Sequence, residues 1–265
     1  MTDDFESMFF NAAYKFGCDK VTAHSYEGAY ARHLARYQNV SDLKILEIGV
    51  GGEGYASGGA SLKMWSEIFP QASVYGLDIF DKSFLNVGKI KTFILDQGDS
   101  FALKSFAEEY GPFDIIVDDG SHMRSDVLTS LFNLFVFLKP NGVYVIEDLM
   151  TSYWPKYGGS TLARNVLDTP LSWTKNLIDV VHRNDMLSID ERLPQWNIKA
   201  VCVYAGIAFI EAGAPRLLTN LPDSPDFLKN QISDDCAMYG NNAKLYEGVN
   251  FDFFNTLEKI KSGDI

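Results

Sequence analysis

Five short apolar segments alternate with segments of helical periodicity across the first half of this 265-residue chain. Each apolar segment ends in small or polar residues, and Gly or Pro stops follow the helical segments. The apolar segments cover residues 43–50, 72–79, 90–97, 113–120 and 142–149, and the helical ones cover 60–69, 100–110 and 126–138. This repeated β-α-β order predicts an α/β fold, a doubly wound and mostly parallel sheet with helices on both faces.

The remaining residues extend this core at both ends. Residues 198–214 have the pattern of two strands with a tight Ala-Gly turn, which predicts an antiparallel terminal hairpin and seven strands in all. Residues 1–40 have a helical pattern and are expected to form a lid, and residues 245–263 are expected to form a last helix. With 46% apolar residues the chain can bury one full core, so we expect a single domain. Its core spans 41–214 and a C-terminal extension spans 215–265.

Charge and cysteine content exclude several classes of partner and site. A net charge of -12 argues against a broad basic face for nucleic acid or a membrane surface. Cys18, Cys202 and Cys236 are an odd number without zinc spacing, which indicates neither a disulfide framework nor a zinc site. The N-terminus lacks a basic region followed by an apolar core, and no stretch reaches the ~20 apolar residues of a membrane span. We expect a cytoplasmic protein.

Ligands of doubly wound sheets bind beyond the carboxyl ends of the strands. The first strand runs directly into glycines, and Gly49 and Gly51 would let a ligand approach the backbone closely. Asp78 ends the second strand, where an acidic residue often binds a ribose diol. Together these features favour a nucleoside cofactor over a structural turn beside a solvated Asp.

Glu47, inside the first strand, separates two kinds of nucleoside cofactor. Its carboxylate would repel the pyrophosphate of a dinucleotide but would favour the sulfonium and ammonium groups of S-adenosylmethionine. The alternative for Glu47 is a buried carboxylate capped by backbone NH groups. After the third strand, Asp96, Gln97 and Asp99 lie where an adenine edge would be read, with a polar turn as the alternative.

Adjacent acidic residues end two neighbouring strands. Asp118 and Asp119 end the fourth strand, and Glu147 and Asp148 end the fifth. Four converging carboxylates would repel one another, and a hard divalent cation removes that repulsion. Oxygen ligands favour Mg²⁺, with Mn²⁺ or Ca²⁺ as substitutes, whereas the alternative is that one or two of these acids cap turns. His122, three residues past Asp119, fits a general base better than a structural hydrogen-bonding residue.

The motifs LEIGVGG, GGASLKMW, GLDIFDKS, FDIIVDDGSH and GVYVIEDLMTSYWPKYGGS together resemble the macrocin and mycinamicin O-methyltransferases. These are metal-dependent, Rossmann-like class I enzymes that methylate sugar hydroxyls of glycosylated natural products. The resemblance covers residues 17–160. It implies Asp119, Glu147 and Asp148 as metal ligands and His122 as the catalytic base. It also implies S-adenosylmethionine and Mg²⁺ as cofactors, a sugar or glycoside as acceptor, and assembly as a homo-oligomer.

Further residues are assigned to the cofactor and the acceptor. Asp118 joins Glu47, Gly49, Gly51, Asp78, Gln97 and Asp99 in the expected cofactor site. By the resemblance, Lys20, His24, Tyr26 and Tyr30 of the N-terminal segment help to cover the cofactor. The aromatic loop 152–159 is expected either to stack on an acceptor ring or to pack in the ordinary way.

Two other functions share part of this pattern. A nicotinamide-dependent oxidoreductase would use the glycine loop and Asp78 but leaves the acidic pairs after the fourth and fifth strands unexplained. A non-catalytic binding protein would keep the cofactor site without turnover, against which the combination of Asp119, His122, Glu147 and Asp148 argues.

Overall fold

The computed structural model describes residues 2–52, 54, 57–161, 168–183 and 193–213. All of these residues belong to one compact unit that spans Met1–Leu217. The expected C-terminal extension and last helix lie outside the described residues, so the prediction of a single domain over the whole chain stays a prediction.

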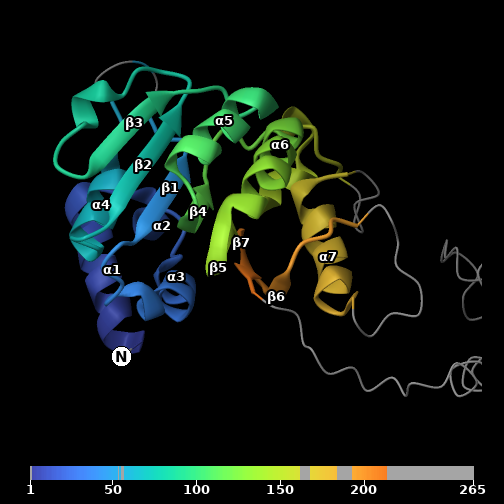
Figure 1. Ribbon diagram of the computed structural model, residues 1–265, viewed down its shortest axis with the longest axis horizontal. Coiled ribbons are helices and arrows are strands. Elements are labelled where there is room, and N and C mark those ends of the chain that lie inside the picture. The colour runs from blue at the N-terminus through green and yellow to red at the C-terminus, as the bar shows by residue number, and fades with distance from the viewer. Residues whose placement is uncertain (1, 53, 55–56, 162–167, 184–192, 214–265) are drawn as a thin grey trace, which may run out of the picture. The chain divides into compact units, whose positions relative to one another are not determined.

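Seven strands form one sheet in the order β3-β2-β1-β4-β5-β7-β6 (Figure 1). The first five strands are parallel to one another, and β7 pairs antiparallel with both β5 and β6. The sheet therefore matches the predicted doubly wound core with its terminal hairpin. The strands are β1 (Lys44–Ile48), β2 (Ser73–Asp78), β3 (Ile90–Ile94), β4 (Phe113–Asp118), β5 (Leu138–Ile146), β6 (Ile198–Tyr204) and β7 (Ile207–Ala212).

Helices cover both faces of this sheet (Figure 1). The α-helices are α1 (Thr2–Phe16), α2 (Asp19–Thr22), α3 (Glu27–Leu34), α4 (Ala60–Ile68), α5 (Ser100–Tyr110), α6 (Arg124–Leu134) and α7 (Pro170–Val181). The 3-10 helices are η1 (Ala35–Tyr37), η2 (Ser83–Leu85), η3 (Phe135–Phe137), η4 (Leu149–Tyr153) and η5 (Pro155–Tyr157). None of the described helices is both long and apolar enough to cross a membrane.

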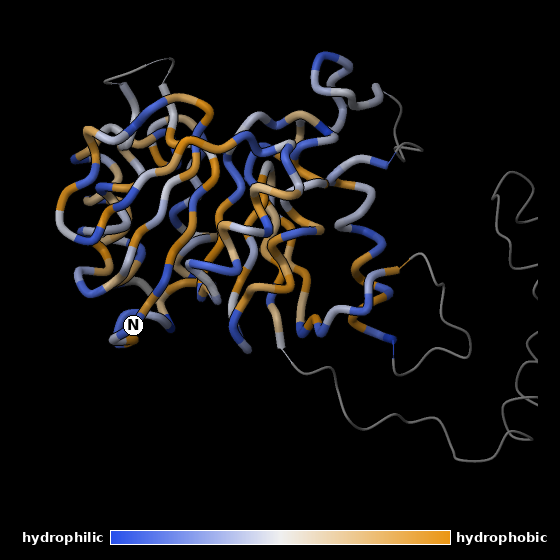
Figure 2. Tube along the Cα trace, turned by 45° about the horizontal axis from the view of Figure 1, so that its top comes forward, coloured by the Kyte–Doolittle hydropathy of each residue, from blue (hydrophilic) through white to orange (hydrophobic). Residues whose placement is uncertain are grey.

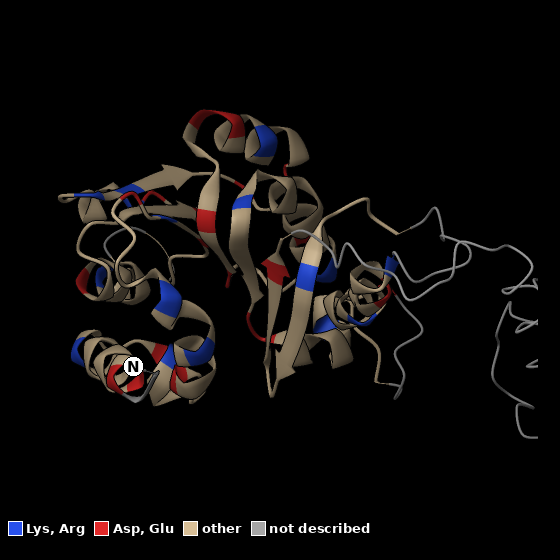
Figure 3. Cartoon of the chain, turned by 60° about the horizontal axis from the view of Figure 1, so that its bottom comes forward, with Lys and Arg blue, Asp and Glu red and all other residues tan. Residues whose placement is uncertain are grey.

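Two apolar cores form because successive strand residues point to opposite faces. On β4, Ile115 and Val117 join the core under α1, α3 and α4, whereas Ile116 joins the core under α5, α6 and α7. Apolar stretches run through the middle of the described residues in Figure 2, and Figure 3 shows most of the length of the strands without charge. The charged residues that matter for the site therefore lie at or beyond strand ends.

The N-terminal segment packs as part of the first core. Phe9 stacks on Tyr30 with ring centroids 5.0 Å apart, and both rings contact Trp65 of α4. Tyr30 also contacts Phe209 of β7. Helix α1 lies against α3 and α4 by these contacts, so the predicted helices are present, and their function as a lid over a cofactor stays a prediction.

Helix α7 was not predicted from the sequence, although its boundary carries a recognisable signal. Thr169 caps the helix by accepting a hydrogen bond from the Ser172 amide, and Pro170 occupies the first turn. A Thr N-cap followed by Pro is a common signal for the start of a helix, but a search for alternating strands and helices in the core does not detect it.

Candidate active site

The carboxyl ends of β1, β4 and β5 lie side by side. Ile48 pairs with Asp118, and Asp118 pairs with Ile146, so the residues that follow these three positions meet at one edge of the sheet. From β1, successive strands are added toward one edge of the sheet up to β3 and then, from β4, toward the other edge. Doubly wound folds bind ligands at this switch between β1 and β4. The backbone NH of Asp119 donates to the carbonyl of Ile48, and that of Glu147 donates to the carbonyl of Asp118.

Strand alternation sorts the acidic residues between the two faces of the sheet. Glu47, Asp119 and Glu147 lie on the face covered by α1, α3 and α4, where all three contact the Lys20 ammonium. Asp118, one residue before Asp119, points to the other face, as a two-residue repeat requires. The expectation that four strand-end carboxylates converge is therefore wrong for Asp118.

Asp118 lies among neutral hydrogen-bond donors. Its carboxylate accepts from Gln97 Nε2 at 2.6 Å, from the Tyr144 hydroxyl at 2.9 Å and from the Ser130 hydroxyl. Burial raises the pKa of Asp118 to about 7, although these donors favour the charged form. Gln97 also accepts from the amide of Ser121, so this network fixes the start of the loop that carries His122.

Asp119, His122 and Asp148 form the group best arranged to bind a metal among the described residues. One ligand atom from each lies within 4.8 Å of the others. His122 Nε2 is 3.5 Å from Asp148 Oδ2, and all three side chains are about one-fifth exposed. The two carboxylates of this group fit a hard divalent cation, and the imidazole lies close enough to act beside it.

Two of these residues have left-handed backbone conformations. His122 has a φ of 57° and Asp148 a φ of 49°, values that side chains other than glycine adopt at a cost. Simple alternation would send Asp148 to the face opposite Glu147. The turn at Asp148 instead brings its carboxylate near that of Asp119, on the same side as Glu147.

Lys20 of α2 lies in the middle of the buried acids. Its ammonium is 2.7 Å from Glu147 Oε1, 2.8 Å from Asp119 Oδ2 and 3.1 Å from Glu47 Oε1, and the side chain is completely buried. Burial alone would lower the pKa of Lys20, but the three carboxylates together raise it well above its ordinary value. Lys20 is therefore charged at neutral pH.

Neutral donors complete the surroundings of the two buried glutamates. The Tyr30 hydroxyl donates to Glu147 Oε1, and Trp65 Nε1 donates to Glu47 Oε2 at 3.1 Å. Burial raises the pKa of Glu147 to about 8 and also raises that of Glu47, against the opposing effect of Lys20. Glu47 is fully buried, which agrees with the alternative prediction of a buried carboxylate. Its partners are the side chains of Lys20 and Trp65, whereas that alternative expected backbone NH groups.

Other N-terminal residues contact the outer acid. Tyr26 donates a 3.4 Å hydrogen bond to Asp148 Oδ1, and His24 Nδ1 is 3.8 Å from the same oxygen. His24 stacks on Tyr26 with ring centroids 5.0 Å apart. The four N-terminal residues predicted to cover a cofactor thus all contact the acidic residues, a long-range arrangement that no local sequence pattern signals.

The glycine loop after β1 is built for close contact. Gly49 has a φ of 83°, and a Cβ atom there would lie 2.1 Å from the carbonyl oxygen of Asp119, so only glycine fits. Gly51 has a φ of 71°, and a Cβ atom there would meet nothing within 4 Å. The space beside the Gly51 Cα is therefore open, and a ligand could approach the backbone there.

Lys82, which sequence reasoning missed, holds this loop from below. Its ammonium donates to the carbonyl oxygens of Gly51, Gly52, Gly54 and Ser57 at 2.7–3.0 Å, and the side chain is buried. Lys82 lies four residues after Asp78 but about 30 residues after the glycines, so no local sequence pattern indicates that it binds their loop.

The other predicted cofactor residues differ in how open they are. The Asp78 carboxylate is partly exposed and accepts from the amides of Val50 and Phe80 at 3.1 and 2.9 Å. Asp99 caps α5 by accepting from the Ala102 amide. Gln97 is buried against Asp118, so within this set Asp78 borders the glycine loop most directly.

Two aromatic residues of the segment after β5 lie near His122. The Tyr157 ring lies 6.1 Å from the His122 ring, and Trp154 lies 6.0 Å from Tyr157 with 48% of its surface exposed. This arrangement gives the site an apolar wall that a flat or ring-shaped ligand can contact.

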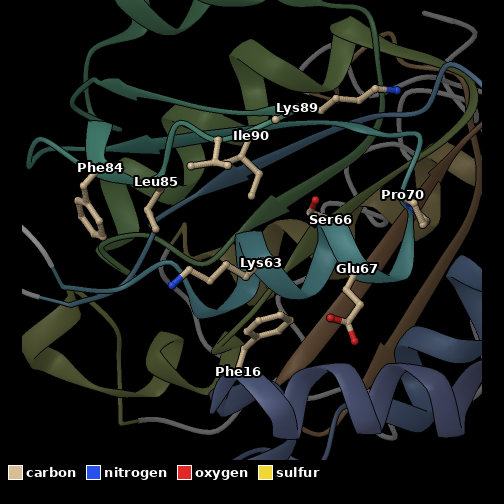
Figure 4. A pocket seen from close by; sticks show the side chains of 11 residues that line it. Phe16, Lys63, Ser66, Glu67, Pro70, Phe84, Leu85, Lys89 and Ile90 are labelled. Atoms are coloured by element: carbon tan, nitrogen blue, oxygen red, sulfur yellow. The ribbon is translucent and has the colours of Figure 1, made fainter.

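A separate groove lies elsewhere on the described part of the protein (Figure 4). Its volume is about 690 Å³, and Lys63, Glu67, Lys89 and Ile90 are among its lining residues. Ile90 begins β3, so this groove lies toward the opposite end of that strand from the acidic residues. We do not assign the chemistry to it.

The sequence is similar to those of several known proteins. The chain is 42% identical over 194 residues to mycinamicin VI 2''-O-methyltransferase of Micromonospora griseorubida, covering 72% of this chain and 48% of that protein. It is 40% identical over 194 residues to demethylmacrocin O-methyltransferase of Streptomyces fradiae, covering 72% and 49%. No family model matches the chain.

A solved structure agrees with these relatives. MycE methyltransferase from the mycinamycin biosynthetic pathway, in complex with Mg and SAH, is 37% identical and superposes with a TM-score of 0.75. The match covers 84% of this chain and 59% of that one. The chain is a relative of the macrocin- and mycinamicin-type sugar O-methyltransferases. The predicted resemblance and the predicted class I methyltransferase fold are confirmed, and the chain spans about half the length of the curated relatives it matches.

Proposed function

We propose that this protein is an S-adenosylmethionine- and Mg²⁺-dependent O-methyltransferase that acts on a sugar hydroxyl of a glycosylated natural product. The observation that carries this proposal is the grouping of Asp119, His122 and Asp148 within 4.8 Å, at a strand edge beside an open glycine loop. The relatives' names support the same reaction, since one names mycinamicin VI and another, from Streptomyces olivaceus, names a rhamnosyl tetracenomycin C as the methylated compound.

The donor set fits a hard divalent cation. Asp119 and Asp148 each present a carboxylate, and Glu147 is buried directly beside Asp119. Both contacts that Glu147 makes with Lys20 and Tyr30 use Oε1, so Glu147 would hold the metal through its other oxygen, Oε2. Mg²⁺ usually keeps several waters and takes few carboxylates, which agrees with so small a set.

The glycine loop and Asp78 fit the cofactor. Gly51 has open space above its backbone, and the partly exposed Asp78 carboxylate lies against the amide of Val50 in the same loop. We assign the nucleoside to this edge. Gln97, Asp118 and Glu47 would act from behind it, by holding the strand ends in place, and Asp99 by capping α5.

His122 is the proposed general base. When bound, S-adenosylmethionine supplies the methyl group and Mg²⁺ lowers the pKa of the acceptor hydroxyl. The imidazole takes the proton of that hydroxyl, and Asp148, 3.5 Å from Nε2, stabilises the imidazolium that results. Trp154 and Tyr157 would orient the acceptor by contact with its rings.

The test is a methyl-transfer assay with purified protein. Macrolide and anthracycline-like glycosides, with one free vicinal diol on the sugar, are incubated with S-adenosylmethionine and Mg²⁺, and products are detected by a mass increase of one methylene group. Turnover that a chelator removes and Mg²⁺ restores supports the proposal. Absence of any methylated product and of any S-adenosylmethionine binding would reject it.

The same preparation separates the alternatives. Calorimetric titration with S-adenosylmethionine and with NAD(P)⁺ distinguishes a methyltransferase from an oxidoreductase, because the acidic residues near the glycine loop disfavour a pyrophosphate. Binding of S-adenosylmethionine without turnover on any glycoside would favour a non-catalytic binding protein. Homo-oligomeric assembly and a cytoplasmic location stay predictions.

A further inference from the structure

A lysine occupies the space between the strand-end carboxylates. Lys20 comes from the short helix α2. Its ammonium lies 2.7–3.1 Å from Glu47, Asp119 and Glu147, which lie at the carboxyl ends of three different strands. Its side chain is completely buried, so solvent does not compensate its charge. The proposed methyl-transfer reaction does not use this lysine.

The local charge explains why a buried cation is present. Glu47, Asp119, Glu147 and Asp148 bring four carboxyl groups together, and Lys20 is the cation among them. Without it, neighbouring carboxylates in a region of low dielectric would repel one another. Lys82, the other fully buried lysine nearby, contacts backbone carbonyl oxygens and so carries a different function.

Lys20 also contacts the same carboxyl groups that a divalent cation would use. Asp119 lies both in the group that can hold a metal and in the ion pair with Lys20, and Glu147 is shared in the same way by our assignment. A positive charge about 3 Å from a ligand lowers the electrostatic attraction of that ligand for a second cation.

We propose that Lys20 is an internal counter-ion of the metal site: it keeps the carboxylates assembled when no divalent ion is bound, and it weakens their affinity for that ion. This inference rests on the proposed function, because it assumes a divalent cation at Asp119 and Asp148. Through Lys20 of α2 and Tyr30 of α3, the N-terminal segment becomes part of the metal site.

The experiment measures Mg²⁺ affinity by calorimetry, Mn²⁺ affinity by electron paramagnetic resonance, and Tm with and without Mg²⁺. Lys20→Met is expected to lower the Tm of the metal-free protein by on the order of 10 °C. It is also expected to tighten divalent binding at least ~10-fold, because three carboxylates lose their partner. Added Mg²⁺ should then raise the Tm of this variant more than that of the wild type.

Lys139→Met is the matched control. Lys139 lies on β5 and pairs with Asp114 of β4 at 2.7 Å, toward the other end of the two strands that carry the acidic pairs. The substitution removes the same charge and one ion pair, so it should leave divalent affinity unchanged. An equal tightening in this control would mean that net charge, and not the position of Lys20, sets the affinity.

Glu47→Gln keeps the test decisive if Lys20→Met does not fold. Glu47 is not a proposed ligand, so removing its charge leaves Lys20 more available to Asp119 and Glu147 and should weaken divalent binding several-fold. Unchanged or tighter binding in Glu47→Gln, or weaker binding in a folded Lys20→Met protein, would overturn the inference. A wild-type protein that binds no divalent ion would instead reject the proposed function itself.

Discussion

Asp118 and Asp119 are neighbours in the chain but lie in opposite environments. Asp118 points to the face of α5 and α6, where neutral groups surround it and solvent is excluded. Asp119 points to the face of α1, α3 and α4, where it meets the Lys20 ammonium and remains one-fifth exposed beside Asp148. The two residues of an acidic pair at a strand end can therefore have different functions. Asp118 supports the loop that carries His122, and Asp119 is available to a ligand.

The strongest test of this difference removes the charge of Asp119. We expect Asp119→Asn to abolish Mg²⁺-dependent turnover, because it removes a carboxylate ligand while keeping the size of the side chain. Turnover is measured at saturating S-adenosylmethionine across a range of Mg²⁺ concentrations, and cofactor binding is followed by calorimetry. Cofactor binding should be retained, and full activity in this variant would remove Asp119 from the metal site.

The next test separates the base from the ligands. His122→Ala is expected to lower kcat at least ~100-fold, the usual scale of a lost general base, with S-adenosylmethionine affinity retained. A pH-rate profile provides the check, since the wild type should show an ionisation that the variant lacks. If the variant keeps the same profile and rate, the base is another residue.

A smaller effect is expected at Asp118, and it concerns stability. The folded-state pKa of Asp118 is about 7, above the ordinary value of 3.8, so the folded state binds the proton more tightly than the unfolded state. The free energy of unfolding should therefore fall as the pH rises from about 4 to about 7, by on the order of a few kcal/mol. Asp118→Asn should make this fall smaller while turnover persists, as urea unfolding at pH 5 and pH 8 would show, and Glu147 and Glu47, whose pKa values are also raised, should account for the part that remains.

Asp42→Asn, at an exposed position, serves as the control for the Asp118 measurement. It should leave the pH dependence of unfolding as in the wild type. A fall in stability as large in Asp118→Asn as in the wild type would assign the whole pH dependence to the buried carboxyl groups on the opposite face.

The smallest expected effect is at the aromatic wall. Trp154→Ala should raise the KM for a glycoside about 2- to 10-fold with little change in kcat, because one exposed ring contributes roughly 0.5–1.5 kcal/mol of contact. The comparison variant is Trp173→Ala, whose ring contacts Phe132 on the other face of the sheet. An equal KM change in both variants would indicate a general loss of packing.

Much of the fold followed from the sequence because its cues are local. Five apolar segments and the helical periodicity between them predicted the succession of β1 to β5 along the chain. The Ala-Gly turn predicted the hairpin of β6 and β7. The separation of Asp118 from Asp119 was also accessible, since alternation along a strand requires it. The prediction that Asp118 and Asp119 both join one group of carboxylates did not take this alternation into account.

The rest of the site depends on contacts that connect distant positions. Lys20 is 99 residues from Asp119, and Lys82 reaches back about 30 residues to the glycine loop. The position of Asp148 follows from a single left-handed backbone angle that residue type alone did not specify. These features come from tertiary packing, and a local pattern does not encode them.

The left-handed conformations of His122 and Asp148 also bear on how this protein responds to directed evolution. A glycine at either position would relieve backbone strain and so gain stability, and asparagine at 148 would be similarly tolerated. Selection for heat resistance alone would thus enrich the replacements that remove the imidazole and the outer carboxylate. A library meant to make this protein more robust should hold these two codons fixed.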